Sequence, residues 1–204
     1  MSRSMSLMLA TGNPGKAAEL RAILALYLDL NGVRLLTPRD WPAPLPDVAE
    51  TGTTFAENAR LKAEVLAAAT GHAALADDSG LCVDALGGAP GLYSARWAGE
   101  GASDADRNAK LLLTLADVPP ESRTARFVCA AALATPGERT VMGEGVCEGV
   151  ILDAPRGTNG FGYDPLFLLP GLGRTMAELT TEEKNRLSHR ALAVSRLSSH
   201  FSAL

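Results

Sequence analysis

The sequence predicts an α/β protein in which short buried strands alternate with amphipathic helices. An apolar run at residues 7–10 precedes a glycine-containing loop and a helical stripe, and a second apolar run at residues 73–76 follows a capped helix. Residues 127–135 and 139–151 have the composition of two strands joined by a hairpin turn. With 204 residues, 47% of them hydrophobic, the chain can form one large domain or two closely joined lobes.

The first predicted unit is a strand, a polar loop and a helix. The loop is Thr11-Gly12-Asn13-Pro14-Gly15-Lys16. The helix is indicated by apolar residues spaced i, i+3, i+4, i+7 and i+8, namely Leu20, Ile23, Leu24, Tyr27 and Leu28. Such a loop presents backbone N–H groups and the positive end of a helix dipole, and Lys16 adds an ammonium group, so the unit favours a phosphate. Its spacing is not that of the nucleoside triphosphatase P-loop, and an ordinary turn with a surface lysine is the alternative.

A second strand and a proline-rich connection precede the next helix. The strand is expected at residues 33–36, and the prolines of residues 37–47 favour an extended or turn-rich connection that leads to Glu50. Thr54 and Glu57 then have the spacing of a capping box, which marks a helix start.

This second helix carries polar residues on one face. Asn58 and Lys62 lie four residues apart and therefore share that face, and Gly71 is placed to end the helix. Two interpretations remain open: the pair reaches into a cleft, or it forms part of a solvated polar surface.

The apolar run at residues 73–76 ends in two neighbouring carboxylates, Asp77 and Asp78. The run predicts a short strand covered on both faces, with the carboxylates in a turn at its carboxyl end, where ligands bind in open α/β sheets. Adjacent carboxylates repel each other unless a cation or proton intervenes, and Mg²⁺ prefers carboxylate oxygens, so the pair is a candidate metal site. The alternative is that one aspartate caps a turn with Ser79-Gly80.

Glycines and a further helix follow the central strand. The segment at residues 87–91 predicts a sharp turn. Ser103 and Asp106 then mark a helix start, and the buried side of that helix is expected at Leu111, Leu112 and Leu115.

A long loop at residues 154–165 follows the predicted hairpin. Gly160 and Gly162 lie on either side of Phe161 and permit the backbone to approach a ligand closely. Phe161 and Tyr163 offer ring faces that suit a flat base. The alternative is a strand entry with core aromatics.

A capping box at Thr180 and Glu183 predicts a C-terminal helix. An unbroken helix would put Lys184 and Arg190 on different faces, so one site for both requires a break or a wrapped ligand. The expected core side of the helix is Leu187, Ala191, Val194 and Leu197.

The composition argues against nucleic acid and membrane partners. A formal net charge of -4 gives no overall attraction to polyanions, so a bound phosphate must meet a local basic pocket. Cys82, Cys129 and Cys147 are widely spaced and odd in number, which favours a reducing compartment. The N-terminal apolar run is too short for a signal peptide, and no stretch approaches the roughly 18 apolar residues of a membrane span. We therefore expect a cytoplasmic protein.

Several blocks, in this order, closely resemble the inosine triphosphate pyrophosphatase family. They are residues 11–16 (TGNPGK), 50–62, 76–81 (ADDSGL), 86–96, 161–165 (FGYDP) and 183–190. The resemblance extends from about Leu7 to Ala193, which is nearly the whole chain.

The resemblance implies one domain over residues 1–204, with an elongated mixed sheet, flanking helices and two lobes around a central cleft. It also implies a homodimer that uses Mg²⁺ to hydrolyse non-standard purine nucleoside triphosphates, such as dITP, ITP and XTP, to monophosphate and pyrophosphate. Cutting between the α- and β-phosphates requires an aimed water and positive charge over the phosphate oxygens.

The same resemblance assigns roles by matching position. Asp78 is expected to be the general base, with Asp78, Asp77 and Glu50 near the metal. The groups expected to hold phosphates are Thr11, Gly12, Asn13, Pro14, Gly15, Lys16, Lys62 and Lys184. The rest of the nucleotide site is expected to be Ser79, Phe161, Gly162, Tyr163, Asp164, His189 and Arg190. As hydrogen-bond donors, His189 and Arg190 suit the 6-oxo group of hypoxanthine or xanthine better than the amino group of adenine.

Three other functions remain as alternatives. A related enzyme could act on pyrimidine triphosphates, and a non-catalytic nucleotide sensor could keep the phosphate loop without turnover. A nucleic-acid-binding module fits poorly because the chain is acidic and has no basic stripe. A serine hydrolase is not indicated, since the chain has no G-x-S-x-G elbow, and a cysteine hydrolase is not indicated, since no cysteine has a recognisable catalytic context.

Overall fold

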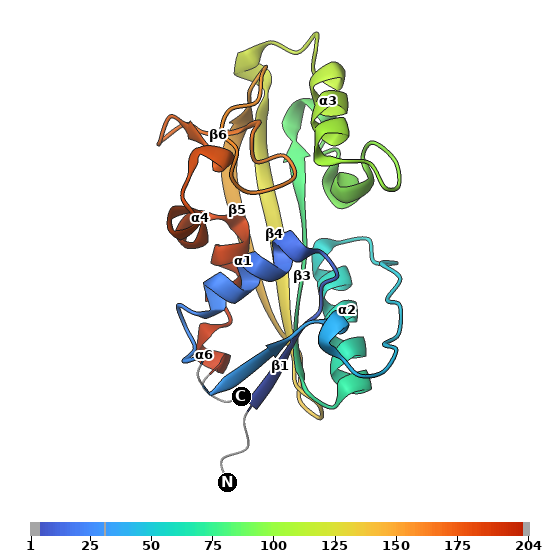
Figure 1. Cartoon of the computed structure of the whole chain (residues 1–204). Helices are drawn as coiled ribbons and strands as arrows, with labels where there is room; N and C mark the ends of the chain where they lie inside the picture. The colour runs from blue at the N-terminus through green and yellow to red at the C-terminus, as the bar shows by residue number, and fades with distance from the viewer. Residues whose placement is uncertain (1–4, 31, 202–204) are drawn as a thin grey trace. The chain divides into compact units, whose positions relative to one another are not determined.

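A computed structural model describes residues 5–30 and 32–201 of the chain (Figure 1). Residues 1–4, part of the N-terminal segment considered above, lie outside the described residues. The helices are α1 Pro14–Leu24, α2 Phe55–Thr70, α3 Asp104–Thr114, α4 Thr181–Leu187, α5 His189–Ser195 and α6 Ser198–Phe201. The strands are β1 Met5–Leu9, β2 Val33–Leu36, β3 Ala73–Val83, β4 Thr124–Ala134, β5 Val141–Ile151, β6 Phe167–Leu169 and β7 Arg174–Thr175.

Within the described residues these strands form a seven-stranded sheet in the order β2-β1-β3-β4-β5-β6-β7. Strand β1 pairs in parallel with β2 and β3, whereas β6 pairs antiparallel with β5 and β7. The sheet is therefore mixed and helices flank it, which confirms the predicted α/β class. The chain divides into two compact units, which we describe separately.

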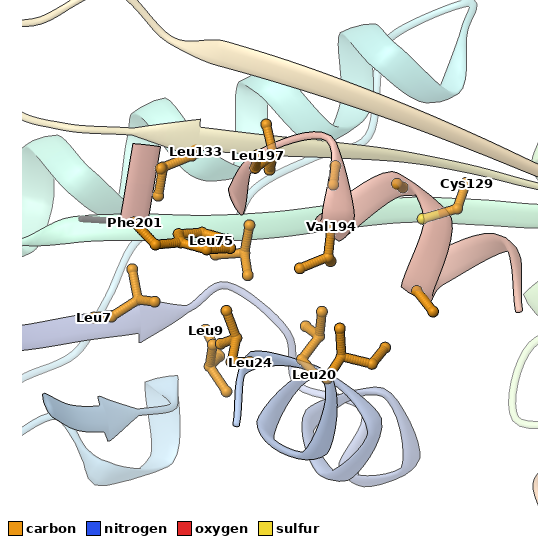
Figure 2. Close-up of a cluster of buried hydrophobic side chains, with 14 residues drawn as sticks. Leu7, Leu9, Leu20, Leu24, Leu75, Cys129, Leu133, Val194, Leu197 and Phe201 are labelled. Carbon is orange, nitrogen blue, oxygen red and sulfur yellow. The ribbon is translucent and has the colours of Figure 1, made fainter. Parts of the chain in front are cut away.

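The first unit contains residues up to Asp78, residues 129–145 and residues from Arg190 on. Its strands are covered on both faces, and β1 shows why. Leu7 and Leu9 pack into one hydrophobic cluster with helix α1, and the alternate residue Met8 packs into a second cluster with α2. Figure 1 shows α1 and α2 beside these strands, and Figure 2 shows Leu9 beside Leu24 of α1 in the first cluster.

Small side chains let α2 pack closely on the second face. Ala59 and Ala63 of α2 are fully buried in one cluster with Ala74 and Ala76 of β3. The helix begins with the predicted capping box, in which Thr54 and Glu57 each bond to the other's backbone N–H. It ends at Gly71, whose φ of 67° is left-handed and suits glycine.

The second unit contains residues 79–128 and 146–189. Its core joins the carboxyl-terminal part of β3 to α3 and to the region around β6, through residues such as Leu81, Leu111 and Phe167. The rings of Phe127 and Phe167 are 4.4 Å apart between centroids. Helix α3 begins with the predicted capping box of Ser103 and Asp106.

The predicted end of the central strand was wrong. Strand β3 does not stop at residue 76 but continues through Asp77, Asp78 and Ser79 to Val83. Polar residues end a strand when the side chains need water, but here both aspartates are buried against charged partners, so the backbone stays extended.

Other boundaries agree with the predictions in part. Strand β2 spans residues 33–36 as expected. The predicted stripe of the first helix was too long, because α1 ends at Leu24 and the chain turns before Tyr27 and Leu28. The predicted C-terminal helix is broken at Ser188, between α4 and α5. Among the described residues, no helix combines the length and apolar character needed to cross a bilayer.

Candidate functional site

Asp77 and Asp78 point to opposite faces of β3 because successive side chains of a strand alternate. Asp77 shares its face with Leu75, in the cluster that packs on α1, and Asp78 shares its face with Ala76, in the cluster that packs on α2. The two carboxylates therefore have separate sets of partners. Mutual repulsion, the basis for expecting a cation between them, is reduced by this arrangement.

Asp77 lies in a buried cluster of charges. Its Oδ2 atom is 3.1 Å from Lys16 Nζ and 3.0 Å from Arg190 Nη2, and it accepts a hydrogen bond from Arg190 Nε. Burial raises the pKa of Asp77, but the positive charges of Arg190 and Lys16 outweigh burial and hold that pKa well below its usual range. Asp77 is therefore ionised at any working pH and is not suited to accept a proton.

Arg190 is only 1% exposed and lies between two carboxylates. Besides Asp77, it donates from Nη1 to Glu19 of α1. Burial lowers the pKa of Arg190, but Asp77 and Glu19 raise it overall. The expected contact of Arg190 with the nucleotide stays a prediction; the structure shows contacts that orient Asp77.

Asp78 has a different environment on the α2 side. It is 8% exposed, and its carboxylate accepts a hydrogen bond from Asn58 Nδ2 at 3.1 Å and contacts Lys62 Nζ at 3.1 Å. Burial raises the pKa of Asp78, and the opposing charges of Lys62 and Lys16 do not fully offset it. Of the two aspartates, Asp78 is the one suited to take a proton from water.

Lys62 joins Asp78 to Glu50. Its Nζ atom is 2.8 Å from Glu50 Oε1, so two carboxylates from distant segments converge on one cation. Burial lowers the pKa of Lys62, whereas Asp78 and Asp77 raise it, with a net increase. The shared face of Asn58 and Lys62 thus reaches a carboxylate site and is not a solvated surface.

Gly52 sets the path of the segment that carries Glu50. Its N–H donates to Asn58 Oδ1 at 2.8 Å, so the same asparagine holds both this segment and Asp78. A Cβ atom at position 52 would lie 2.7 Å from Asn58 Oδ1 and from Glu57 Cβ. Only glycine permits this close approach.

The loop at residues 11–16 has an ordered form. Asn13 caps α1 by accepting a hydrogen bond from Lys16 N–H at 3.1 Å, and its own N–H donates to Thr11 Oγ1. The loop is not a random surface turn, because Lys16 reaches the Asp77 cluster.

A cavity of about 250 Å³ lies beside this loop. Its wall includes Thr11, Gly12, Asn13 and Pro14, and also Arg21 and Arg39, which sequence reasoning did not single out. Only the tertiary structure brings Arg39 to this loop. Glu19 was also missed, although it lies on the helix that follows the loop.

The donor set around Asp78 fits a hard divalent cation. Within residues 5–30 and 32–201, no three His, Cys, Asp or Glu side chains are grouped to hold a metal by themselves. Two carboxylates, Asp78 and Glu50, do share the ammonium of Lys62. Mg²⁺ commonly takes one or two protein carboxylates and completes its shell with water and phosphate oxygens, so this pair suits it. The expected third ligand, Asp77, stays a prediction, because its Oδ2 contacts Lys16 and Arg190.

In the second unit, the loop before β6 carries a second group of predicted site residues. Asp164 Oδ2 accepts a hydrogen bond from Phe161 N–H at 2.9 Å and forms an ion pair with Lys184. Lys184 Nζ also lies 4.9 Å from the centroid of the Phe161 ring. These three residues therefore form one cluster.

The remaining predicted residues of this unit have other partners. Tyr163 is 4% exposed and donates from its hydroxyl to Ser94 O at 2.9 Å, so its ring belongs to the core and is not a stacking face for a base. His189 stacks on Phe127 with ring centroids 4.7 Å apart. Ser79 is half-buried on β3.

The chain matches known proteins over nearly its whole length. Residues 7–200 match the Ham1 family. The chain is 54% identical over 191 residues to a dITP/XTP pyrophosphatase of Geobacillus kaustophilus (strain HTA426), an alignment that covers 94% of this chain and 91% of that protein. It is also 54% identical over 187 residues to a dITP/XTP pyrophosphatase of Streptomyces coelicolor, with 92% of each covered.

Solved structures agree with these matches. A HAM1 protein from Coxiella burnetii has a TM-score of 0.84 and 42% identity, over 98% of this chain and 100% of that one. A nucleoside-triphosphatase / dITP/XTP pyrophosphatase from Mycobacterium abscessus has a TM-score of 0.71 and 45% identity, over 98% of each chain. Fold, motif order and sequence identity lead to one conclusion: this chain belongs to the Ham1 family.

Proposed function

We propose that this protein hydrolyses non-standard purine nucleoside triphosphates, namely dITP, ITP and XTP, to the monophosphate and pyrophosphate. The observation that carries the proposal is the contrast between Asp77 and Asp78 in a chain of this family. One carboxylate is enclosed by Lys16 and Arg190. Its neighbour contacts Asn58 and Lys62, and it shares Lys62 with a second carboxylate, that of Glu50.

Asp78 acts as the general base in this proposal. It accepts a proton from the water that attacks the α-phosphorus, and pyrophosphate leaves. Asn58 orients the Asp78 carboxylate through its 3.1 Å hydrogen bond. Asp77 does not take part in proton transfer, since its low pKa makes it a poor acceptor.

Lysines and the capped loop hold the phosphates. Lys16, Lys62 and Lys184 supply positive charge, and the loop from Thr11 to Lys16 supplies backbone N–H groups at the start of α1. A triphosphate carries roughly four negative charges, which a chain of net charge -4 binds only through such a local excess of basic groups.

We also propose that Asp78 and Glu50 hold Mg²⁺. When bound there, Mg²⁺ neutralises phosphate charge and lowers the pKa of the attacking water. Phe161 offers a ring face to the purine, and His189 and Arg190 are the proposed donors for its 6-oxo group. An adenine amino group would not accept the hydrogen bond from His189, a loss that costs about 1–3 kcal/mol. Arg190 already donates to Asp77 and Glu19, so this cost does not apply to it.

The test is product analysis with dITP and ATP side by side, with and without Mg²⁺. We expect pyrophosphate and dIMP from dITP only when Mg²⁺ is present, and a higher kcat/KM for dITP, ITP and XTP than for ATP and GTP. An equal kcat/KM for ATP would contradict the proposed selection for a 6-oxo purine. A preference for a pyrimidine triphosphate would make the protein the related pyrimidine triphosphate hydrolase. Tight binding of dITP without turnover would make it a sensor.

The assembly and compartment are part of the same proposal. We propose a homodimer that works in the cytoplasm, on the strength of the family resemblance and of three cysteines that form no disulfide within the described residues.

A further inference from the structure

The backbone of Gly162 is held on both sides by helix α3 of the second unit. Its N–H donates to Asp104 Oδ2 at 2.7 Å, and its carbonyl accepts a hydrogen bond from Asn108 Nδ2 at 3.0 Å. Asp104 and Asn108 lie four residues apart on the helix and so share one face. We call these two residues the α3 clamp. The α3 clamp binds the backbone of the residue that follows Phe161. The ring of Phe161 is the proposed stacking face for the base.

Neither clamp residue is needed to start the helix. The capping box of Ser103 and Asp106 already satisfies the N-terminus of α3. Asp104 uses its other oxygen, Oδ1, to bind Arg107, which orients Oδ2 toward Gly162. The Asn108 Oδ1 atom is buried and accepts no hydrogen bond from the described part of the chain, so the bond to Gly162 is the contact that orients the amide.

The loop has space to move if the clamp is lost. A cavity of about 470 Å³ lies beside it, with Phe161, Gly162 and Asn108 among the residues of its wall. On the other side, the loop is held by Asp164, which binds Phe161 N–H and Lys184. Gly162 has a φ of 64°, a conformation that glycine adopts freely, so its two hydrogen bonds restrict a residue that has little backbone preference of its own.

We propose that Asp104 and Asn108 are positioning residues that fix Phe161 as the platform on which the purine base stacks. This inference rests on the proposed function. It adds two residues that lie outside the substrate-binding motifs and that influence the KM for nucleotides. They touch neither phosphate nor the attacking water, so their loss weakens base binding and leaves the chemical step intact. Stacking of one base on an aromatic ring corresponds to about 5- to 150-fold in affinity, which bounds the effect.

The experiment compares two variants that break the clamp, one variant that keeps it, and a control at an exposed position of the same helix. Asn108→Asp keeps the shape but replaces the donor by a carboxylate against the Gly162 carbonyl, and Asp104→Ala removes the acceptor. Asp104→Asn keeps an acceptor oxygen for Gly162 N–H, while Arg107 retains its bonds to the carbonyls of Ala95 and Ala102. Leu113→Ala, on the same helix and 78% exposed, is the control.

Steady-state kinetics with dITP and Mg²⁺ are measured for each variant, with inorganic triphosphate as a competitive inhibitor that carries no base. For Asn108→Asp and Asp104→Ala we expect the KM for dITP to rise at least about fivefold. The kcat should stay within about threefold of wild type, and the inhibition constant of triphosphate should not change. Asp104→Asn and Leu113→Ala should behave like the wild type.

The results separate this inference from the proposed function. If the wild type releases no pyrophosphate from dITP, the proposed function fails and this assignment fails with it. If the wild type is active and the clamp variants keep its KM, the clamp is wrong and the function stands. A fall in kcat at unchanged KM, or a parallel rise in the triphosphate inhibition constant, would also overturn the clamp. Thermal unfolding identifies a variant that does not fold, and the isosteric Asn108→Asp then decides.

Discussion

The side chains of Asp77 and Asp78 show how one step along a strand changes the chemistry of a carboxylate. Asp77 is fully enclosed by Lys16 and Arg190, whose charges more than offset the cost of burial. Asp78 keeps some exposure, and burial raises its pKa because the opposing charges of Lys62 and Lys16 and the hydrogen bond from Asn58 do not fully offset it. Asp77 is therefore suited to hold Lys16 and Arg190 in place, and Asp78 is suited to accept a proton.

Replacing Asp78 by Asn should remove turnover without unfolding the protein. The amide has the same shape but accepts no proton, so we expect kcat for dITP to fall at least about a hundredfold. Pyrophosphate release and thermal unfolding are measured together, with Asp117→Asn, at an exposed position, as the control. Near-wild-type turnover in Asp78→Asn would remove this residue from the mechanism.

The low pKa of Asp77 predicts how stability depends on pH. Because its folded-state pKa is below the unfolded value of about 3.9, the ion pairs contribute fully above about pH 4. Below that, the unfolded chain binds the proton first, so stability falls as the pH falls toward the folded-state pKa. At pH 7, the free energy of unfolding of Asp77→Asn should be about 3 kcal/mol lower than that of the wild type, because the buried charge of Arg190 then loses one carboxylate partner, Asp77, and keeps Glu19.

Urea unfolding of both proteins between pH 7 and pH 3 measures this linkage. Below pH 4 the wild-type free energy of unfolding should fall more steeply than that of Asp77→Asn, by up to about 1.4 kcal/mol per pH unit. Parallel curves would mean that Asp77 has an ordinary pKa.

The cysteines should be poor nucleophiles in the native protein. Burial, with a smaller contribution from Asp77, raises the pKa of Cys129 to about 12, and burial raises the pKa of Cys147 to about 11. Both thiols should therefore resist iodoacetamide at about pH 8 until the chain is unfolded. Half-buried Cys82 should react first, although burial raises its pKa too. Mass spectrometry of labelled peptides checks the order, and early labelling of Cys129 would contradict it.

At the level of secondary-structure elements, local signals decided most boundaries. The capping boxes that start α2, α3 and α4 each depend on residues three positions apart, so the sequence suffices to locate them. The continuation of β3 through its two aspartates could not be predicted in this way. It depends on basic residues from α1, α2 and α5, which are distant in the chain.

The segment that carries Glu50 provides a test of element geometry. In Gly52→Ala, the added methyl group would lie 2.7 Å from Asn58 Oδ1 and must displace the segment. We expect Glu50 to shift and the Mg²⁺ concentration for half-maximal activity to rise at least about tenfold, because one of two carboxylates is lost. Gly171→Ala, where a Cβ meets nothing within 4 Å, should leave that concentration unchanged. An unchanged Mg²⁺ requirement in Gly52→Ala would argue against Glu50 as a ligand.

For the whole molecule, the net charge does not describe the charges gathered around the site. The net charge is -4, yet Lys16, Lys62 and Arg190 gather around two consecutive aspartates in the first unit. Arg190 and Asp77 are 113 positions apart, and Arg190 and Glu19 are 171 apart. Composition therefore excludes a general affinity for polyanions but says little about a local phosphate site.

The proposed homodimer predicts the mass of the assembly. Light scattering coupled to gel filtration should give twice the mass of the chain, with and without Mg²⁺, since a stable dimer depends on its own interface and not on the bound metal. The mass of a single chain at micromolar concentration would contradict the dimer.

The amino-acid order alone was enough to predict the α/β class, the starts of α2, α3 and α4, and the family resemblance. The comparisons confirm the family. These features depend on residues close together in the chain or on motifs that are recognised by their order. Folding decided which partners each of the two adjacent aspartates has, which carboxylates surround Arg190, that Tyr163 belongs to the core, and that α3 holds Gly162. Such properties come from hydrogen bonds, charges and burial contributed by distant segments, and those contacts exist only once the chain has folded.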